Sequence, residues 1–360
     1  MKILHVITNL QMGGAEKLMT LLLPKLKHLG VEVEILLLDG TDTPIYQELH
    51  SKGIVIHSLG NMTNVYHPLY LIRLIRFLRI HRYDVVHTHN TAPQFFVAVA
   101  HLFNKKIKLF TTEHSTSNRR RNLKCFRSID RWMYHQYDGV ICISDQAEIN
   151  LRNHLQQSYN NITTIYNGVD IMKIANTLPD EKIKGESKRF IVTMVARMVD
   201  AKDQDTLIRA ISHLSKEDFE LWLVGDGPRR PILESLVKDL RLEDCVKFWG
   251  VRTDVPVLLK TSDIIVMSSH YEGLSLSNIE GMAANKPFVA SNVDGIKEVT
   301  EGAGLLFPHE DDQYLANILL RLKNDTTLYN SVASSCFTRA KKYDISFMAE
   351  KYLQLYTKFL

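Results

Sequence analysis

The feature of this sequence that most constrains its fold is the regular alternation of short apolar runs with longer helical patterns. The apolar runs have the length of strands, and several, such as "GVICIS" at 139–144, are hydrophobic almost without interruption. Uninterrupted runs are typical of strands in a parallel sheet, because helices cover both of its faces. The alternation therefore predicts an α/β fold with parallel sheets.

The alternation occurs as two series, separated by the charged segment "LPDEKIKGESK" at 178–188. A single core stops growing at about 250–300 residues, so a chain of 360 residues favours two domains. We expect two Rossmann-like, doubly wound parallel-sheet domains that face a cleft, at 1–180 and 187–343, with a C-terminal helix at 344–360 packing on the first domain. The predicted strands are residues 3–8, 31–38, 54–58, 84–88, 107–112, 139–144, 162–166, 190–196, 219–225, 246–250, 263–268, 287–291 and 304–307.

The composition excludes several classes of protein. A hydrophobic content of 45% and a charged content of 23% are ordinary for a globular chain. The four cysteines show no paired spacing, which favours free thiols in a reducing compartment over disulfides or a zinc site. The first apolar run is too short for a signal peptide, and no apolar stretch reaches the ~18 residues of a membrane span, so we expect a cytoplasmic protein.

The stretch "MGGAE" at 12–16 lies between a predicted strand and a predicted helix. The dinucleotide fingerprint GxGxxG is absent. Gly13 and Gly14 allow an anion to approach backbone N–H groups at the start of a helix. The alternative is a tight turn in which Glu16 only helps to start the helix, and the stretch by itself leaves both interpretations open.

The stretch "VARMVDAKDQDTLIRA" at 195–210 places Arg197 and Lys202 after a strand, in a loop that enters a helix. Two cations facing a cleft would bind a diphosphate, and the alternative is two solvated surface charges. Asp203 and Asp205 have the spacing of a metal-binding DxD motif, but carboxylates also suit the first turn of a helix. We favour the helical interpretation and predict no metal site.

Two glutamates, Glu272 and Glu280, are separated by seven residues in the region 268–299. Glu272 follows a predicted strand and Glu280 falls within the next helix. A carboxylate at each place can accept hydrogen bonds from vicinal hydroxyls, of a hexose at the loop and of a ribose at the helix, and the amides of 273–275 can meet a phosphate. The alternative is two exposed glutamates.

Together these stretches resemble the retaining GT-B glycosyltransferases of family four, the glycosyl transferases group 1 type with an E-x7-E motif. The segment 262–291 resembles the family's strand, loop, helix and strand around that motif, and 195–210 resembles its Arg…Lys phosphate loop. "LWLVGDGPRR" at 221–230 resembles its Gly-Asp-Gly-Pro turn, and "GGAE" its N-terminal glycine loop. "IYNGVD" at 165–170 resembles its Pro-Asn-Gly-Val-Asp, with Tyr166 in place of proline. The resemblance extends from residue 1 to about residue 358.

The resemblance implies roles for individual residues. The glycine loop would approach the donor diphosphate from the first domain, and the Arg–Lys pair would neutralise it from the second. Glu280 would bind the ribose, Glu272 the donor sugar, and the residues after the strand 246–250 would lie near the base. The implied donor-binding residues are Gly13, Gly14, Gly250, Val251, Gly273, Leu274, Ser275 and Glu280, and the implied catalytic residues are His114, Glu272, Arg197 and Lys202.

Three histidines lie in or just after predicted strands of the first half. His114, in "FTTEHS", resembles the family's active-site histidine, which would bind a sugar hydroxyl or stabilise a cationic transition state. The alternative is a strand-end histidine that caps a backbone carbonyl. His89 matches a recurrent family position and suggests an architectural or acceptor-side role, and His87 is interpreted as structural.

Basic residues concentrate in the first half of the chain. Residues 1–180 contain 20 Lys and Arg against 14 Asp and Glu, whereas the remaining residues contain 24 against 26. The basic amphipathic segment 118–136 suits an anionic membrane surface or a diphosphate-bearing lipid acceptor, and the alternative is a solvated helix. No nucleic-acid-binding module is recognisable. The basic residues assigned to membrane or acceptor binding are Arg119, Arg120, Arg121, Lys124, Arg127 and Arg131.

The resulting expectation is a retaining hexosyl- or N-acetylhexosaminyltransferase that uses a UDP-sugar and requires neither cofactor nor metal. Its acceptor would be a hydroxyl of a lipid-linked saccharide in cell-surface polysaccharide or glycoconjugate synthesis, at the inner face of the membrane. Two alternatives are a UDP-sugar 2-epimerase and a non-catalytic sugar-nucleotide-binding protein.

Overall fold

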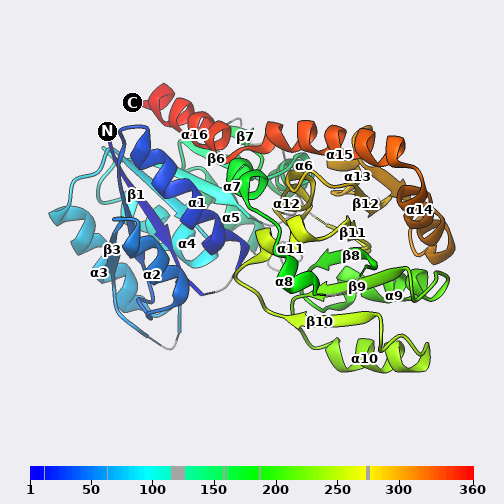
Figure 1. The fold of residues 1–360 in the computed structure, drawn as a ribbon. Helices are drawn as coiled ribbons and strands as arrows, with labels where there is room; N and C mark the ends of the chain where they lie inside the picture. The colour runs from blue at the N-terminus through cyan, green and yellow to red at the C-terminus, as the bar shows by residue number, and fades with distance from the viewer. Residues whose placement is uncertain are drawn as a thin grey trace. The chain divides into compact units, whose positions relative to one another are not determined.

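The computed structural model describes residues 1–11, 13–62, 64–114, 126–156, 159, 161–185, 188–272 and 276–360. Contacts divide the chain into two compact units: Met1–Gly168 with Ile345–Leu360, and Val169–Asp344 (Figure 1). The chain thus passes between units at 168/169 and 344/345, not in the charged segment 178–188. The physical reason is that α7 (Ile171–Asn176) and α8 (Glu181–Lys184) pack on α11 (Val255–Thr261) of the second unit.

The first unit contains a seven-stranded parallel sheet with the order β3-β2-β1-β4-β5-β6-β7. The direction in which successive strands are added to the sheet reverses between β1 and β4. These two strands pair in parallel, and His5 of β1 lies opposite His87 of β4. The strands are β1 (Lys2–Ile7), β2 (Glu32–Leu37), β3 (Val55–Ser58), β4 (Val85–His89), β5 (Lys108–Glu113), β6 (Gly139–Cys142) and β7 (Ile162–Thr164).

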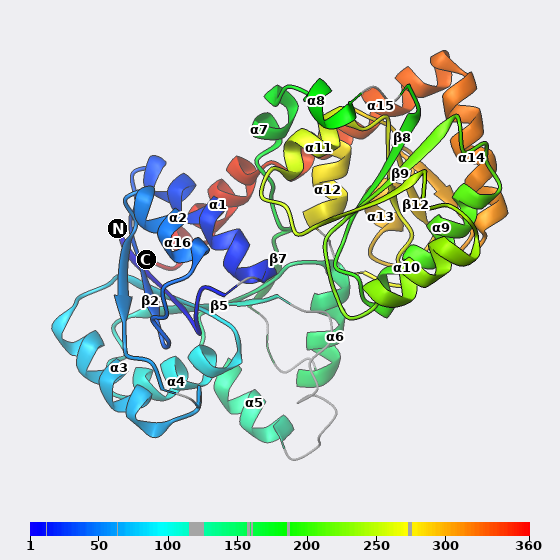
Figure 2. The ribbon, with the colours of Figure 1, turned by 60° about the horizontal axis from the view of Figure 1, so that its bottom comes forward.

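Helices cover both faces of this sheet (Figure 2). Apolar side chains of α1 (Gly14–His28), α2 (Pro44–Ser51) and α16 (Ile345–Phe359) form one core with the strands. Those of α3 (Pro68–Ile80), α4 (Thr91–His101), α5 (Phe126–Tyr134) and α6 (Asp145–Leu155) form the core on the opposite face. Burial on both faces explains why the strand sequences are hydrophobic almost throughout.

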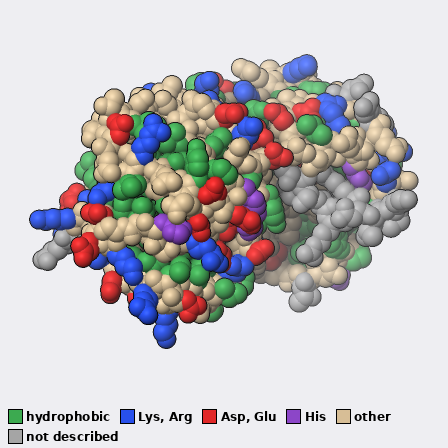
Figure 3. Space-filling view, turned by 90° about the vertical axis from the view of Figure 1, so that its right-hand side faces the viewer, with side chains coloured by type: hydrophobic (Ala, Val, Ile, Leu, Met, Phe, Trp, Pro, Cys, Tyr) green, Lys and Arg blue, Asp and Glu red, His purple; other side chains and the backbone are tan. Residues whose placement is uncertain are grey.

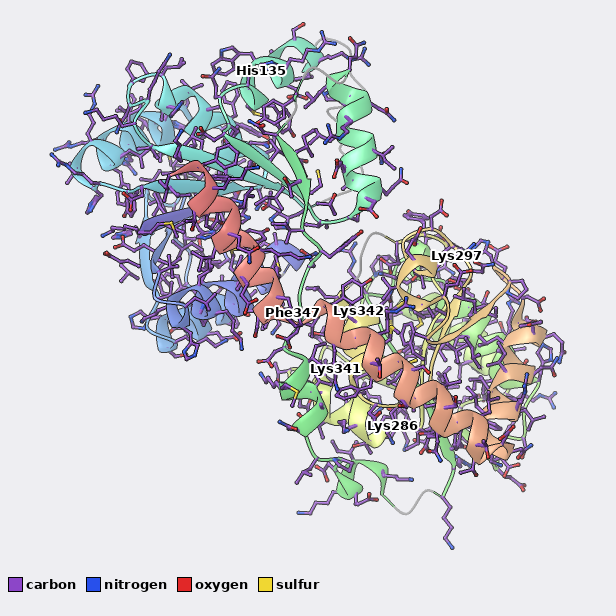
Figure 4. All side chains as sticks on the ribbon, turned by 90° about the horizontal axis from the view of Figure 1, so that it is seen from above. His135, Lys286, Lys297, Lys341, Lys342 and Phe347 are labelled. Carbon is purple, nitrogen blue, oxygen red and sulfur yellow. The ribbon has the colours of Figure 1, made fainter. Side chains whose placement is uncertain are left out.

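The C-terminal helix α16 completes the first unit. Its Tyr352 and Tyr356 are fully buried, and their hydroxyls contact Oγ1 of Thr112 at 3.0 Å and Nδ1 of His87 at 2.5 Å. Figure 4 labels Phe347 near the start of this helix and Lys341 and Lys342 just before it. Residues at the end of the chain are therefore part of the core around β4 and β5.

The second unit contains a six-stranded parallel sheet with the order β10-β9-β8-β11-β12-β13. Its strands are β8 (Phe190–Val195), β9 (Phe219–Val224), β10 (Val246–Gly250), β11 (Ile264–Met267), β12 (Phe288–Ser291) and β13 (Leu305–Phe307). Its remaining helical segments are η2 (Asp200–Lys202), α9 (Gln204–Ser212), α10 (Arg230–Asp239), α12 (Leu276–Ala283), α13 (Lys297–Thr300), α14 (Asp312–Asn324), α15 (Thr326–Ala340) and η3 (Lys341–Tyr343). α9 packs with α10 and α14, whereas α12 packs with α7 and α15. Figure 3 shows basic and acidic side chains interspersed on the face seen from the side of α9 and α14.

The predicted α/β fold is confirmed, and all thirteen predicted strands occur within two residues of their predicted bounds. Among the described residues, Cys142, Cys245 and Cys336 carry buried thiols, and Cys125 lies outside them. Within the same part of the chain, no helix combines the length and the hydrophobicity that crossing a bilayer requires.

Candidate active site

The glycine loop of the first unit lies where β1 ends and α1 begins. Gly13 is the N-cap of α1, and a Cβ added there would lie 2.3 Å from Oε2 of Glu16. A Cβ on Gly14 would meet nothing within 4 Å. Asn90, at the end of β4, donates from Nδ2 to Oε1 of Glu16 at 3.2 Å. Gly13 thus makes room for the Glu16 carboxylate, whereas Gly14 leaves the backbone at the helix N-terminus accessible.

Three histidines from the adjacent strands β1, β4 and β5 form a hydrogen-bonded chain: His5 lies within β1, His89 ends β4 and His114 follows β5. Nδ1 of His5 lies 2.9 Å from Nε2 of His89, and Nδ1 of His89 lies 2.8 Å from Nε2 of His114. His87 stacks with His5 and His89 at centroid distances of 5.2 and 4.6 Å. The sequence-predicted His114 is therefore the outer end of a chain that continues into the core through His89. His5, which sequence reasoning missed, is its inner end.

Burial keeps these imidazoles neutral. It lowers the pKa of His5 to about 3, lowers that of His114 to about 4, and holds that of His89 well below its usual value. In the described part of the chain, Nε2 of His5 has no hydrogen-bond partner. Because a buried N–H without a partner is rarer than a buried acceptor without one, we assign the protons to Nδ1 of His5 and of His89. This arrangement makes His114 Nδ1–H a donor.

A tight turn supports the Arg197 loop of the second unit. Cβ atoms on Gly225 and Gly227 would lie 2.1 Å from the carbonyl oxygen of Ala196 and 2.3 Å from that of Met198. The Met198 N–H also donates to the carbonyl oxygen of Asp226 at 2.9 Å. The glycines of "GDGP" thus allow the turn to lie against the loop backbone and fix its path. Arg197 itself is exposed.

Lys202 and Glu272 form an ion pair at the carboxyl ends of β8 and β11. The Lys202 side chain is 20% exposed and the Glu272 side chain 11% exposed, so both charges are largely removed from water. Ser269 Oγ donates a further hydrogen bond to Glu272 Oε1 at 3.1 Å. The structure thus brings together two sequence-predicted residues that are 70 positions apart.

The two carboxylates of the Asp203-x-Asp205 spacing have different partners at the start of α9. Asp203 caps α9 by accepting a hydrogen bond from the Thr206 N–H at 3.2 Å. Both oxygens of Asp205 accept from Nη2 of Arg229 at 2.8 Å. The predicted role of these carboxylates in the first helical turn agrees with this geometry.

Of the other predicted site residues, some lie in the second unit, two lie on α5 of the first unit, and the rest lie outside the described residues. Glu280 is half-buried in α12, Gly250 ends β10 with a φ of 65°, and Val251 is 64% exposed. Arg127 and Arg131 lie on α5, where Arg131 hydrogen bonds to Oε1 of Gln156. The predicted site residues that lie outside the described residues are Arg119, Arg120, Arg121, Lys124, Gly273, Leu274 and Ser275.

Two family models match the chain: "Glycosyltransferase Family 4" matches residues 12–173, and "Glycosyl transferases group 1" matches residues 189–325. Together they span most of both units. The chain belongs to glycosyltransferase family four. It is an enzyme that transfers a sugar from a nucleotide-sugar donor.

Relatives of this family-four enzyme are similar along most of its length. LpsD of Rhizobium meliloti (strain 1021), a lipopolysaccharide core biosynthesis glycosyltransferase, is 26% identical over 99% of this chain and 98% of its own. The UDP-Gal:alpha-D-GlcNAc-diphosphoundecaprenol alpha-1,3-galactosyltransferase of Escherichia coli is 26% identical over 74% of this chain and 73% of its own. The crystal structure of HepE of Anabaena in complex with UDP superposes with a TM-score of 0.84 at 22% identity, covering 99% of this chain and 100% of that one. The expected GT-B architecture of two parallel-sheet α/β units is confirmed.

Proposed function

We propose that this enzyme transfers a hexosyl or N-acetylhexosaminyl group from a UDP-sugar to a hydroxyl of a lipid-linked saccharide, with retention at the anomeric carbon. The E. coli relative carries UDP-Gal and a diphosphoundecaprenol-linked sugar in its name, and the Anabaena structure contains UDP. LpsD is named for lipopolysaccharide core synthesis. These names support a uridine donor and an acceptor in cell-surface glycoconjugate synthesis.

The Lys202–Glu272 ion pair is the observation that carries the donor assignment. α/β sheets bind ligands at the carboxyl ends of the two strands between which the strand order reverses. In the second sheet these strands are β8 and β11, and Lys202 follows β8 while Glu272 follows β11. When a donor binds, Lys202 turns to the diphosphate and Glu272 accepts hydrogen bonds from the sugar hydroxyls. In the absence of a donor the two side chains neutralise each other, so neither charge is left unpaired where water has little access.

The reaction breaks the bond between the anomeric carbon and the diphosphate oxygen and forms a bond to the acceptor oxygen. The acceptor proton passes to an oxygen of the leaving diphosphate, and UDP is released. Arg197 and Lys202 stabilise the negative charge as it develops, so the step needs no metal ion. Because Nδ1–H of neutral His114 is a donor, we assign His114 to a sugar hydroxyl rather than to proton abstraction.

We assign acceptor access to the side of the first unit on which α3, α4 and α5 cover the sheet. Its exposed apolar residues are Leu69, Ile72 and Ile80 of α3 and Ile129 and Trp132 of α5. The exposed face of α3 adds Arg73, Arg76 and Arg79. Apolar and cationic side chains on one surface suit an anionic bilayer, at which each basic residue contributes about 1 kcal/mol. This surface extends the expected membrane site beyond the segment 118–136.

Turnover with and without acceptor tests the transferase assignment. The full chain is incubated with UDP-glucose, UDP-galactose or UDP-N-acetylglucosamine, with and without a diphosphate-linked lipid saccharide, and products are followed by mass spectrometry. We expect UDP and an extended lipid only when acceptor is present. An epimerised UDP-sugar formed without acceptor would support the isomerase, and donor binding without turnover on a panel of lipid saccharides would support the non-catalytic alternative.

Vesicle binding tests the membrane surface. Changing Arg73, Arg76 and Arg79 to serine should reduce co-sedimentation with anionic vesicles while leaving UDP affinity unchanged. The matched control changes Lys238, Lys341 and Lys342, three exposed cations of the second unit, to serine. Equal loss in both variants would show a non-specific charge effect, and equal sedimentation of the unaltered chain with neutral vesicles would contradict the electrostatic assignment.

A further inference from the structure

Three loops of the second unit bring together a carboxylate and two imidazoles. Asp203 caps α9, His270 follows β11, and His309 follows β13. Nδ1 of His270 lies 2.7 Å from Nε2 of His309 and 3.8 Å from Oδ2 of Asp203. One potential ligand atom from each residue lies within 4.8 Å of the other two. None of the three belongs to the residues assigned to the donor.

Asp203 supplies a buried carboxylate oxygen that accepts no hydrogen bond from the described residues. The residue is 4% exposed, and its Oδ1 accepts the capping hydrogen bond from Thr206. Its buried Oδ2 has no hydrogen-bond partner among the described residues. Since an unpaired buried carboxylate oxygen is costly, this atom indicates a missing cationic partner.

The second carboxylate nearby belongs to Glu310, whose Oε1 lies 3.5 Å from Nδ1 of His270. The two imidazole nitrogens at 2.7 Å share one proton, because one must donate to the other. Two imidazoles beside two carboxylates form a donor set that suits a cation. A divalent cation in place of the shared proton would balance the charge of the carboxylates.

Ring orientation separates this cluster from the histidines of the first unit. His5, His87 and His89 also lie close together, but their planes are within 18° of parallel. Imidazole lone pairs lie in the ring plane, so stacked rings cannot direct them to one point. The rings of His270 and His309 are nearly perpendicular, at 83°, which allows two lone pairs to converge.

We propose that Asp203, His270 and His309 bind a divalent transition-metal ion of the zinc type, with Glu310 as a fourth ligand. Tetrahedral zinc has bonds of about 2.0–2.2 Å to nitrogen and oxygen, which places its ligand atoms roughly 3.3 Å apart. The two contacts to His270, at 2.7 and 3.8 Å, bracket that spacing. Imidazole ligands favour Zn²⁺, Co²⁺ or Ni²⁺ over Mg²⁺ and Ca²⁺.

The ion would join the loops that carry the Lys202–Glu272 pair. Asp203 is adjacent to Lys202 in the chain, and His270 precedes Glu272 by two residues. The His270 N–H donates to the carbonyl oxygen of Ala201 at 3.0 Å, so these two loops already contact each other. Metal binding would therefore fix the positions of Lys202 and Glu272 relative to each other, while the ion itself would not contact the donor. This stabilising role is separate from the proposed sugar transfer.

Metal binding by the full chain tests the proposal. After treatment with EDTA, the chain is titrated with Co²⁺ and followed by visible absorption, then with Zn²⁺ by calorimetry and thermal unfolding. We expect one equivalent of Co²⁺ with the spectrum of tetrahedral nitrogen–oxygen coordination, displacement by Zn²⁺, and a rise in Tm. Mg²⁺ should produce none of these changes.

Two variants and one control locate the site. Asp203→Asn retains a residue that caps helices and accepts the φ of 46°, and His309→Gln changes an exposed side chain. Each should weaken Zn²⁺ binding at least tenfold without changing the Tm of the metal-free chain. The control His213→Gln removes another histidine beside a carboxylate, Asp312, and should bind Zn²⁺ normally. Unchanged Zn²⁺ affinity in both site variants, or the absence of stoichiometric binding by the unaltered chain, would overturn the proposal.

Discussion

The buried histidine chain should make the first unit sensitive to mild acid. His5 is fully buried, and burial lowers its pKa from 6.5 to about 3. In the unfolded chain His5 takes up a proton below about pH 6.5, whereas in the folded chain it stays neutral down to about pH 3. The unfolded state therefore binds more protons in this window, and the free energy of unfolding falls as the pH falls.

The size of the effect follows from the two pKa values. A pH of about 5 lies roughly 1.5 units below the pKa of His5 in the unfolded chain. Protonation of His5 therefore stabilises the unfolded chain at that pH by about 2 kcal/mol. Above pH 7 the contribution is close to zero. His89 and His114, whose pKa values are also lowered by burial, add to the loss in the same direction.

His5→Phe isolates the contribution of one histidine. Phenylalanine keeps an aromatic ring beside His87 and His89 but cannot take up a proton. Its absolute stability will change, because the hydrogen bond to His89 is lost, so the informative quantity is the change in unfolding free energy between pH 7 and pH 5. We expect the variant to lose about 2 kcal/mol less than the unaltered chain over that interval.

Urea unfolding at both pH values, followed by circular dichroism, measures this difference. The chain has two units, so each transition is fitted separately and only one should respond. The control His28→Gln changes an exposed histidine at the end of α1 and should follow the unaltered chain. If His5→Phe and the unaltered chain lose the same stability between the two pH values, His5 takes up no extra proton on unfolding and the reasoning fails.

Other predictions concern the donor site and the turn beneath it. Glu280→Ala should weaken UDP binding by about 1–3 kcal/mol in calorimetry, and an unchanged Kd in a folded variant would remove Glu280 from the site. Arg197→Ala and Lys202→Ala should reduce kcat more than they raise KM, whereas normal turnover at saturation would limit them to ground-state binding. Gly225→Ala should destabilise the second unit by more than about 2 kcal/mol, because the φ of 130° and the Ala196 carbonyl oxygen both oppose a Cβ. Gly14→Ala, where a Cβ meets nothing, should retain its Tm in calorimetry but bind UDP more weakly.

Most of the fold could be predicted because burial on both faces of a parallel sheet leaves a local signal. Strands such as β6 and β11 are apolar along their whole length, so their positions did not depend on knowing their neighbours. The boundary between units was harder to place. The charged segment 178–188 has the composition of a linker, but the nearby α7 and α8 pack on the second unit through contacts that are distant in sequence.

The candidate site could be predicted only in part, because its geometry depends on which strands become neighbours. Lys202 and Glu272 were each predicted, but their ion pair requires β8 beside β11. His5 lies in an apolar strand and has no local signal of its link to His89. Its only sequence signal was a histidine within a run that otherwise belongs to the core. The cluster of His270 and His309 likewise depends on neighbouring loops from distant parts of the chain.

The contribution of α16 to the first unit has a consequence for biosynthesis. Topologically the second unit is an insertion within the first, because the segment that supplies Tyr352 and Tyr356 follows the second unit in the chain. At about 5–20 residues per second, roughly 10–35 s separate the synthesis of Gly168 from that of Ile345. During this time the strands of the first sheet lack the helix that covers Phe110 and His87. The last residue of the second unit is made before α16 is, so the second unit can fold before the first unit is complete. The nascent first unit therefore exposes apolar surface that a chaperone can recognise until α16 has been made.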